Sequence, residues 1–135
     1  MMVLDTSVLI AILTEDKDAL RYAAAISSAD TSLISAASVV EAGIFMGKRH
    51  GPGGERRVSA LLQEAGCRIE AVTAYHAQLA IEAYAVYGEG QGKAALNYGD
   101  CFSYALAKAT GLPLLFKGGG FAETDIQPAN ASIPL

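Results

Sequence analysis

Three acidic residues stand where helices are expected to begin or on an expected helix face: Asp5, Glu41 and Asp100. Asp5 ends the apolar run 2–4, Asp100 follows a glycine at the head of an apolar stretch, and Glu41 has mostly apolar neighbours one helical turn away. Carboxylates that converge repel each other, and a hard divalent cation such as Mg²⁺ removes that penalty. A bound Mg²⁺ ion could then activate water to hydrolyse a phosphodiester.

Each of these acids also has a purely structural interpretation. Asp5 could be the N-cap of the helix that follows it, and Asp100 could interact with the positive end of its own helix. Glu41 is expected to face inward, where a carboxylate needs a cation or another partner; the alternative is a tilted helix from which Glu41 reaches solvent. The residues alone leave these alternatives open.

Other common catalytic patterns do not occur in the sequence. There is no G-x-S-x-G, no Walker A pattern, and no G-x-G-x-x-G after the first strand. His50 and His76 have no obvious catalytic partner. Cys67 and Cys101 lie far apart and form no C-x-x-C, which argues against a zinc site.

The charge balance restricts how the protein could bind nucleic acid. The net charge is −4, so a general positive field is excluded and a local basic patch would be needed. The best candidate is Lys48-Arg49-His50 together with Arg56-Arg57, across a Gly-Pro-Gly-Gly turn. The alternative is a solvated loop with ordinary surface charges.

Length and apolar content predict one soluble domain over residues 1–135. Hydrophobic residues make up 52% of the chain, but no apolar run approaches the roughly 20 residues that would cross a bilayer. The segment before Asp5 has no basic region typical of a signal peptide. We therefore expect a cytoplasmic protein without a membrane span.

Short apolar runs alternate with helical patterns along the chain, which predicts an α/β fold with a mostly parallel central sheet flanked by helices. The expected strands are 2–4, 31–35, 68–71 and 113–116. The expected helices are 8–13, 18–28, 55–65, 74–87 and 101–110, and one more that is capped by Ser35 or Ser38 and ends near Arg49. In such sheets the ligand crevice lies beyond the carboxyl ends of the strands, which is where Asp5 and the loop after Phe116 are expected.

The sequence resembles the VapC toxins of the PIN-domain family along essentially its whole length. The resemblance rests on four segments in this order: VLDTSVLI from Val3, ISAASVVEA from Ile34, LNYGDCFSYALA from Leu96 and PLLFKG from Pro113. It implies a parallel-sheet fold, an endoribonuclease activity that depends on Mg²⁺ or Mn²⁺, and inhibition by a VapB-like antitoxin. A homodimer is also implied.

The resemblance assigns the site by position. The implied catalytic and metal-binding acids are Asp5, Glu41 and Asp100, and Asp125 matches a further acidic, metal-binding position. The implied supporting residues are Thr6, Ser7 and Asn97, with Thr6 or Ser7 beside Asp5.

One departure from the family pattern concerns the last part of the site. Such toxins typically read Lys-Gly-Asp-Asp-Phe where this chain reads Lys117-Gly118-Gly119-Gly120-Phe121. Gly119 and Gly120 thus replace one or two expected acids. The alternative function is therefore an antitoxin- or RNA-binding PIN-like protein that cleaves weakly or not at all.

Overall fold

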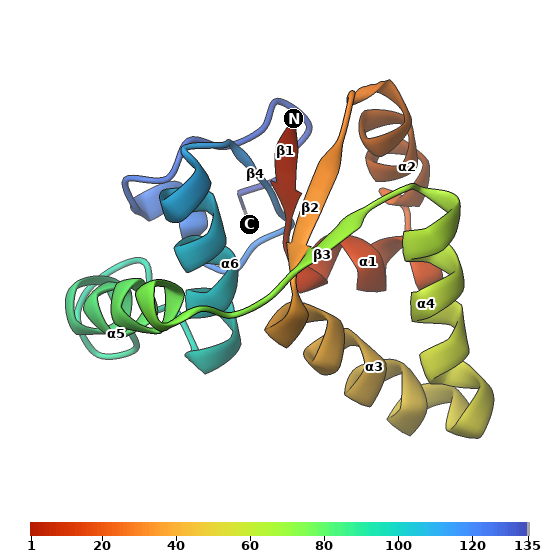
Figure 1. Cartoon of the computed structure of the whole chain (residues 1–135), viewed down its shortest axis with the longest axis horizontal. Coiled ribbons are helices and arrows are strands. Elements are labelled where there is room, and N and C mark those ends of the chain that lie inside the picture. The colour runs from red at the N-terminus through yellow and green to blue at the C-terminus, as the bar shows by residue number, and fades with distance from the viewer. Residues whose placement is uncertain (135) are drawn as a thin grey trace.

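A computed structural model describes residues 1–134 (Figure 1). In this part of the chain a four-stranded, wholly parallel sheet has the order β3-β2-β1-β4. The strands are β1 (Met2–Leu4), β2 (Ser32–Ser35), β3 (Arg68–Glu70) and β4 (Leu114–Leu115). The α-helices are α1 (Thr6–Leu13), α2 (Ala19–Ser28), α3 (Ala36–His50), α4 (Gly54–Glu64), α5 (Ala74–Tyr87) and α6 (Tyr98–Thr110). The predicted α/β fold is confirmed.

The sheet separates two layers of helices, with α5 and α6 on one side and α1 to α4 on the other (Figure 1). Side chains of the strands alternate between the two layers, as the period of two requires. The cluster with α5 and α6 contains Val3, Leu33 and Leu114. The cluster with α1 to α4 contains Leu4, Ile34 and Leu115. Burial on both faces explains why β1 and β4 are wholly apolar and why β2 has Leu33 and Ile34 at its centre.

The carboxyl ends of the strands position the segments that carry the acids. Val3 pairs with Leu33 and Leu114 in the neighbouring strands, so β1, β2 and β4 end at the same edge of the sheet. Asp5 follows β1 directly, and α3 follows β2. The turn Gly118–Gly120, which we call the glycine turn, follows β4 after Phe116 and Lys117. This edge is the usual ligand crevice of a parallel sheet.

Two helices begin earlier than the apolar pattern predicts, because polar residues cap them. Helix α1 begins at Thr6 rather than Val8, since Asp5 accepts from the backbone N–H of Ser7. Helix α6 begins at Tyr98 rather than Cys101, since the Asn97 side chain accepts from the backbone N–H of Asp100. No helix within residues 1–134 is both long enough and apolar enough to cross a membrane.

A short 3₁₀ helix, Gly51–Gly53, follows α3, and another, Phe121–Glu123, follows the glycine turn. The tail, which the sequence pattern does not classify, returns beside β4. Isolated bridges join Leu114 to Pro128 and Lys117 to Ile133. The tail therefore covers the outer edge of β4 and helps to fix the start of the glycine turn.

Candidate active site

Asp5 is both a helix cap and a buried carboxylate. Its backbone is extended, with φ −86° and ψ 156°, and its side chain is only 4% exposed. Oδ2 accepts from the backbone N–H of Ser7 at 3.0 Å and from the Ser7 hydroxyl at 2.6 Å. Oδ1 accepts from the hydroxyl of Ser103 at 2.5 Å. The capping interpretation is therefore correct for one oxygen, while the other is directed toward α6.

Ser7 links Asp5 to the glycine turn. The same hydroxyl that donates to Asp5 accepts from the backbone N–H of Lys117 at 3.0 Å. The Lys117 ammonium pairs with Asp16 at 2.6 Å and with Asp18 at 3.0 Å. Its hydrogen bond to Asp16 raises the pKa of Lys117 and lowers the pKa of Asp16. The start of the turn is thus held on the α1 side of the site.

Thr6, the other residue predicted to support Asp5, makes a different contact. Its hydroxyl donates to the backbone carbonyl of Ser38 at 3.2 Å. The hydroxyl oxygens of Ser38 and Ser103 are 3.2 Å apart, and both side chains are buried. Thr6 therefore joins α1 to α3, while Ser103 is the hydroxyl that joins α6 to Asp5.

Asp100 forms a capping box with Asn97. The backbone N–H of Asp100 donates to Oδ1 of Asn97, and the backbone N–H of Asn97 donates to Oδ2 of Asp100, each at 2.9 Å. Burial raises the pKa of Asp100 to about 7; the hydrogen bond from Asn97 opposes that rise, and the charges of Asp5, Glu41 and Glu89 add to it. The structure therefore brings Asp5 and Glu41 into the surroundings of Asp100.

Glu41 is exposed, so the prediction that it faces inward is wrong. The buried face of α3 carries Ser38, Ala42 and Met46 instead, and Glu41 lies beside that face. Its carboxylate rests against Gly99, where a Cβ atom would collide with both carboxylate oxygens. Gly99 therefore provides the space that lets Glu41 lie next to Asp100.

The sequence pattern did not identify two serines that hold the site together, Ser38 and Ser103. Ser38 lies one helical turn before Glu41 and Ser103 one turn after Asp100, which is the only local signal that could have suggested them. Within residues 1–134, no three His, Cys, Asp or Glu side chains are close enough to form a ready-made metal cage. The acids are neighbours without a completed coordination sphere.

Gly119 and Gly120, the two positions at which the family pattern has acids, differ in the space around them. Gly118, Gly119 and Gly120 have φ values of +68°, +78° and +76°. An ideal Cβ at Gly119 would lie 3.5 Å from Oδ1 of Asp100, so this position faces the acids. An ideal Cβ at Gly120 would overlap the backbone carbonyl of Ala94. An acid at position 120 does not fit this backbone.

Asp125, the remaining predicted metal ligand, lies elsewhere in this structure. Its Oδ1 accepts from the Tyr104 hydroxyl at 2.7 Å, and its Oδ2 pairs with the Lys108 ammonium at 2.6 Å. Burial acts to raise the pKa of Asp125, but Lys108 and Tyr104 outweigh it and hold the pKa below its ordinary value. Asp125 therefore belongs to an ion pair one to two turns further along α6, and not to the acidic cluster around Asp100.

Comparison with known proteins shows the family of the chain. Residues 2–127 match the family model described as the PIN domain. The chain belongs to the PIN-domain family. This PIN domain is 45% identical over 133 residues to ribonuclease VapC30 of Mycobacterium tuberculosis, covering 98% of this chain and all of that protein. It is 46% identical to ribonuclease VapC of Mycolicibacterium smegmatis, covering 93% and 97%.

Solved structures share the PIN fold at lower identity. Mycobacterium tuberculosis VapC20, described as a sarcin-ricin loop cleaving toxin, has a TM-score of 0.78 at 19% identity, covering 96% of this chain and 98% of that one. VapBC2 of Rickettsia felis, bound to a DNA fragment from its promoter, has a TM-score of 0.66 at 15% identity, covering 99% and 96%. The resemblance to VapC toxins of the PIN-domain family is confirmed.

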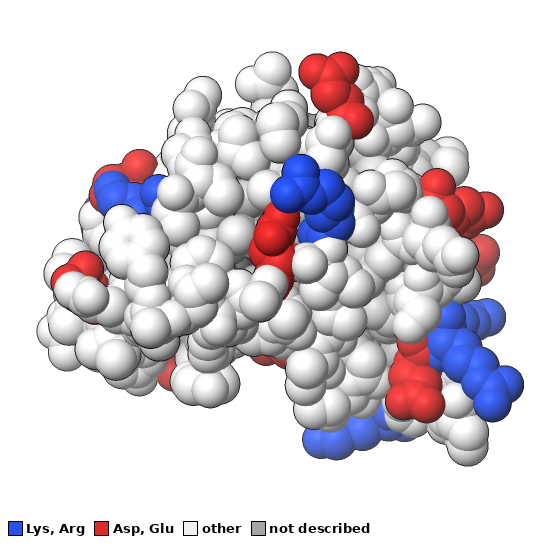
Figure 2. All heavy atoms as spheres, viewed as in Figure 1, with Lys and Arg blue, Asp and Glu red and all other residues white. Residues whose placement is uncertain are grey.

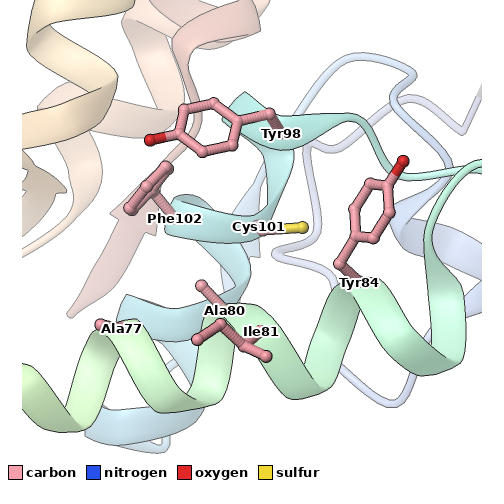
Figure 3. A pocket seen from close by; sticks show the side chains of 7 residues that line it. All are labelled: Ala77, Ala80, Ile81, Tyr84, Tyr98, Cys101 and Phe102. Atoms are coloured by element: carbon pink, nitrogen blue, oxygen red, sulfur yellow. The ribbon is translucent and has the colours of Figure 1, made fainter.

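Two apolar hollows lie along α6 of the PIN domain, and one of them contains Glu41. One lies between α5 and α6 (Figure 3) and is lined by Ala77, Ala80, Ile81, Tyr84, Tyr98, Cys101 and Phe102. The other lies between α3 and α6 and is lined by Ala37, Val40, Glu41, Ile44, Tyr98, Gly99 and Phe102. Tyr98 and Phe102 border both hollows, and their rings meet edge to face with centroids 5.0 Å apart. An apolar surface therefore extends to the edge of the acidic cluster.

Proposed function

We propose that this protein is the ribonuclease toxin of a VapBC-type toxin–antitoxin pair and that it hydrolyses RNA phosphodiester bonds at Asp5, Glu41 and Asp100. The observation that carries the proposal is the position of Asp100, whose pKa is raised first by burial and further by the charges of Asp5 and Glu41. Acids gathered at the carboxyl edge of a parallel sheet are suited to phosphodiester chemistry when a cation offsets their charge. The names of the full-length relatives support the ribonuclease activity.

The donor set fits Mg²⁺ or Mn²⁺, because hard cations prefer carboxylate oxygens. Among the hydrogen bonds within residues 1–134, those of Asp100 leave its Oδ1 free, and the carboxylate of Glu41 is exposed. Oδ2 of Asp5 already accepts two hydrogen bonds from Ser7, whereas Oδ1 accepts only the one from Ser103 and keeps a second lone pair. When bound, the ion would supply positive charge for the phosphodiester and make a water molecule more acidic.

The protein's own groups hold the acids in place. Ser7 and Ser103 fix the direction of the Asp5 carboxylate, and Asn97 fixes Asp100. Because the pKa of Asp100 is about 7 without a cation, this carboxyl can hold a proton near neutral pH. Binding of a cation requires the ionised form, so we expect proton release when the site is loaded.

The activity is tested by incubating purified protein with a fluorescent single-stranded RNA in Mg²⁺, in Mn²⁺ and in EDTA. We expect cleavage with either ion, and none in EDTA or with the Asp5→Asn variant. Equal cleavage by wild type in EDTA or by Asp5→Asn would contradict the proposed site.

A second candidate function is favoured by Gly119, which faces Asp100 without a side chain of its own. In this alternative the protein binds an antitoxin or RNA but cleaves weakly. Stable RNA or antitoxin binding by folded wild type, with no cleavage in saturating Mn²⁺, would select this function.

For the antitoxin, the proposed contact is an amphipathic helix that lies in the two apolar hollows and extends a basic side chain to the acids. Substituting Ile81, which is 72% exposed in the first hollow, by Asp should weaken co-purification with a co-expressed VapB-like antitoxin. Binding that is unchanged in Ile81→Asp, or that leaves cleavage unreduced, would contradict this contact. The proposed homodimer is tested by light scattering of the purified chain.

A further inference from the structure

The basic side chains that make no ion pair within residues 1–134 gather in one place. Of the ten Lys and Arg residues, Arg68, Lys108 and Lys117 pair with acids, and Arg21 donates to backbone carbonyls. Four of the other six lie at the turn between α3 and α4: Lys48, Arg49, Arg56 and Arg57. All four are exposed, and we call this group the α3–α4 tip.

The α3–α4 tip is positive although the protein as a whole is negative. Blue side chains gather at the lower right of Figure 2, over the ends of α3 and α4, with acidic atoms between them. Glu55 is the acidic residue in the same turn, so four cations face one acid there, with His50 beside them. A concentrated positive end on an acidic protein is suited to a polyanion that the rest of the surface repels.

Helix α3 connects the α3–α4 tip to the acids. Lys48 follows Glu41 by nearly two full turns, so the two residues share one face of α3, about 10 Å apart along the axis. A hollow between α3 and α4 is lined by Val39, Val40, Gly43, Ile44, Gly47, Lys48, Glu55, Val58 and Ser59. Its residues Val40 and Ile44 also line the hollow that contains Glu41. The two hollows are therefore neighbours on α3, separated by Val40 and Ile44, and one contains Glu41 while the other contains Lys48.

The face of α3 between Glu41 and Lys48 is apolar, and the aromatic ring of Tyr98 lies beyond Glu41. Gly43 and Gly47 have open space where a Cβ atom would stand, so the large exposed side chains of α3 between Glu41 and Lys48 are the apolar Ile44 and Phe45. On the other side of Glu41, the Tyr98 ring is 77% exposed. An exposed aromatic ring and a group of basic side chains are the features with which proteins stack the bases and hold the backbone of single-stranded nucleic acid.

We propose that the α3–α4 tip binds the phosphates of the RNA substrate, so that a single strand runs along α3 from Tyr98, past the acids, to Lys48, Arg49, Arg56 and Arg57. The inference rests on the proposed ribonuclease function and adds the residues that hold its substrate. Since the acids repel phosphates, a substrate needs cations nearby, and about 10 Å of strand carries about three phosphates. The α3–α4 tip supplies that charge at that distance.

The test measures RNA binding separately from cleavage. A fluorescent single-stranded RNA is titrated in EDTA over a series of salt concentrations with wild type, Lys48→Gln/Arg49→Gln and Arg56→Gln/Arg57→Gln. We expect each double variant to lose about tenfold in affinity at low salt and to flatten the salt slope by about 0.7 for each lost phosphate contact. In Mg²⁺ or Mn²⁺, kcat/KM should fall mainly through KM.

The matched control is Lys17→Gln/Arg68→Gln, which removes the same charge from exposed positions outside the α3–α4 tip. It should bind RNA as wild type does. Equal RNA binding by the tip variants and this control would overturn the inference. It would also be overturned if the tip variants bound RNA normally and lost only their binding to the antitoxin. Absence of cleavage by wild type would contradict the proposed function instead, because the EDTA binding assay does not depend on cleavage.

Discussion

The hydroxyl of Ser103 donates a 2.5 Å hydrogen bond to Oδ1 of Asp5, joining α6 to the end of β1 inside the core. Ser103 is one turn after Asp100, and its partner Ser38 is one turn before Glu41. The hydroxyl pair therefore connects the three elements that carry the acids. Because directed hydrogen bonds fix carboxylate orientation, this pair is expected to set how the acids approach a cation.

Removing that hydroxyl tests its importance. Ser103→Ala leaves Oδ1 of Asp5 without its donor and Ser38 without its neighbour, so we expect the free energy of unfolding to fall by about 1–3 kcal/mol. The measurement is urea unfolding in EDTA. Ser27→Ala, at an exposed position of α2, should change stability by less than about 0.5 kcal/mol. A Ser103→Ala variant as stable as wild type would show that the hydrogen bond from Ser103 to Asp5 does not stabilise the protein.

The three acids should act together. Asp5→Asn, Glu41→Gln and Asp100→Asn each remove a charged ligand, so each should lower Mn²⁺-dependent cleavage by roughly 100-fold or more while the fold is retained. Initial rates on one RNA and circular dichroism are the measurements. Glu82→Gln, which removes an exposed carboxylate from α5, is the control and should cleave as wild type does. If one of the three variants cleaved RNA as wild type does, the substituted residue would not have the proposed role.

Local sequence signals were enough to predict much of the fold and the positions of Asp5 and Asp100 at the starts of helices. Asp5 follows a buried apolar run and has the residue type of a helix cap, and Asp100 lies at a helix start with Asn97 before it. Both signals depend on neighbours in the chain. The parallel sheet follows for the same reason, from apolar runs that alternate with helices.

Contacts between distant segments could not be predicted in this way. The buried face of α3 is Ser38, Ala42 and Met46, small or flexible residues that pack between helices, and this arrangement leaves Glu41 exposed despite its apolar neighbours. The partner of Ser103 on α3 is 65 residues away. Which glycine of the turn faces Asp100 depends on backbone angles, which three identical residues do not reveal.

Asp100 predicts how stability depends on pH. Its pKa is about 7 in the folded protein against an ordinary value of 3.8, chiefly because of burial. Between these values the folded state holds a proton that the unfolded chain has lost, so stability should fall as pH rises from about 4 to about 7 and level off above that. Urea unfolding of the protein in EDTA at several pH values measures this slope.

The same experiment on two variants isolates Asp100. Asp100→Asn cannot titrate but keeps an oxygen for the N–H of Asn97, so its slope between about pH 4 and pH 7 should be shallower. Asp30→Asn removes an exposed carboxyl elsewhere and should keep the wild-type slope. Identical slopes for wild type and Asp100→Asn would show that Asp100 does not titrate in this range.

Gly120→Asp should destabilise the protein rather than repair its site. The new Cβ would overlap the carbonyl of Ala94, and φ at this position is +76°. We expect a loss of at least about 2 kcal/mol in the free energy of unfolding, with no gain in Mn²⁺ affinity. Thermal unfolding and calorimetry are the measurements. A stable Gly120→Asp variant that binds Mn²⁺ more tightly would mean that the turn adopts another conformation.

Gly119→Asp should have the opposite effect on metal binding, because a side chain there points toward Oδ1 of Asp100. Without metal we expect a loss of about 1–3 kcal/mol, from the positive φ, the close contact with Phe121 and the added negative charge. With Mn²⁺, the extra ligand and charge should produce a larger rise in Tm than in wild type. Gly119→Asn is the matched control, since it has the same shape and tolerates the same backbone without the charge. If both variants show the same Mn²⁺-dependent rise in Tm, position 119 lies outside the coordination sphere and the acids bind the ion without help from the glycine turn.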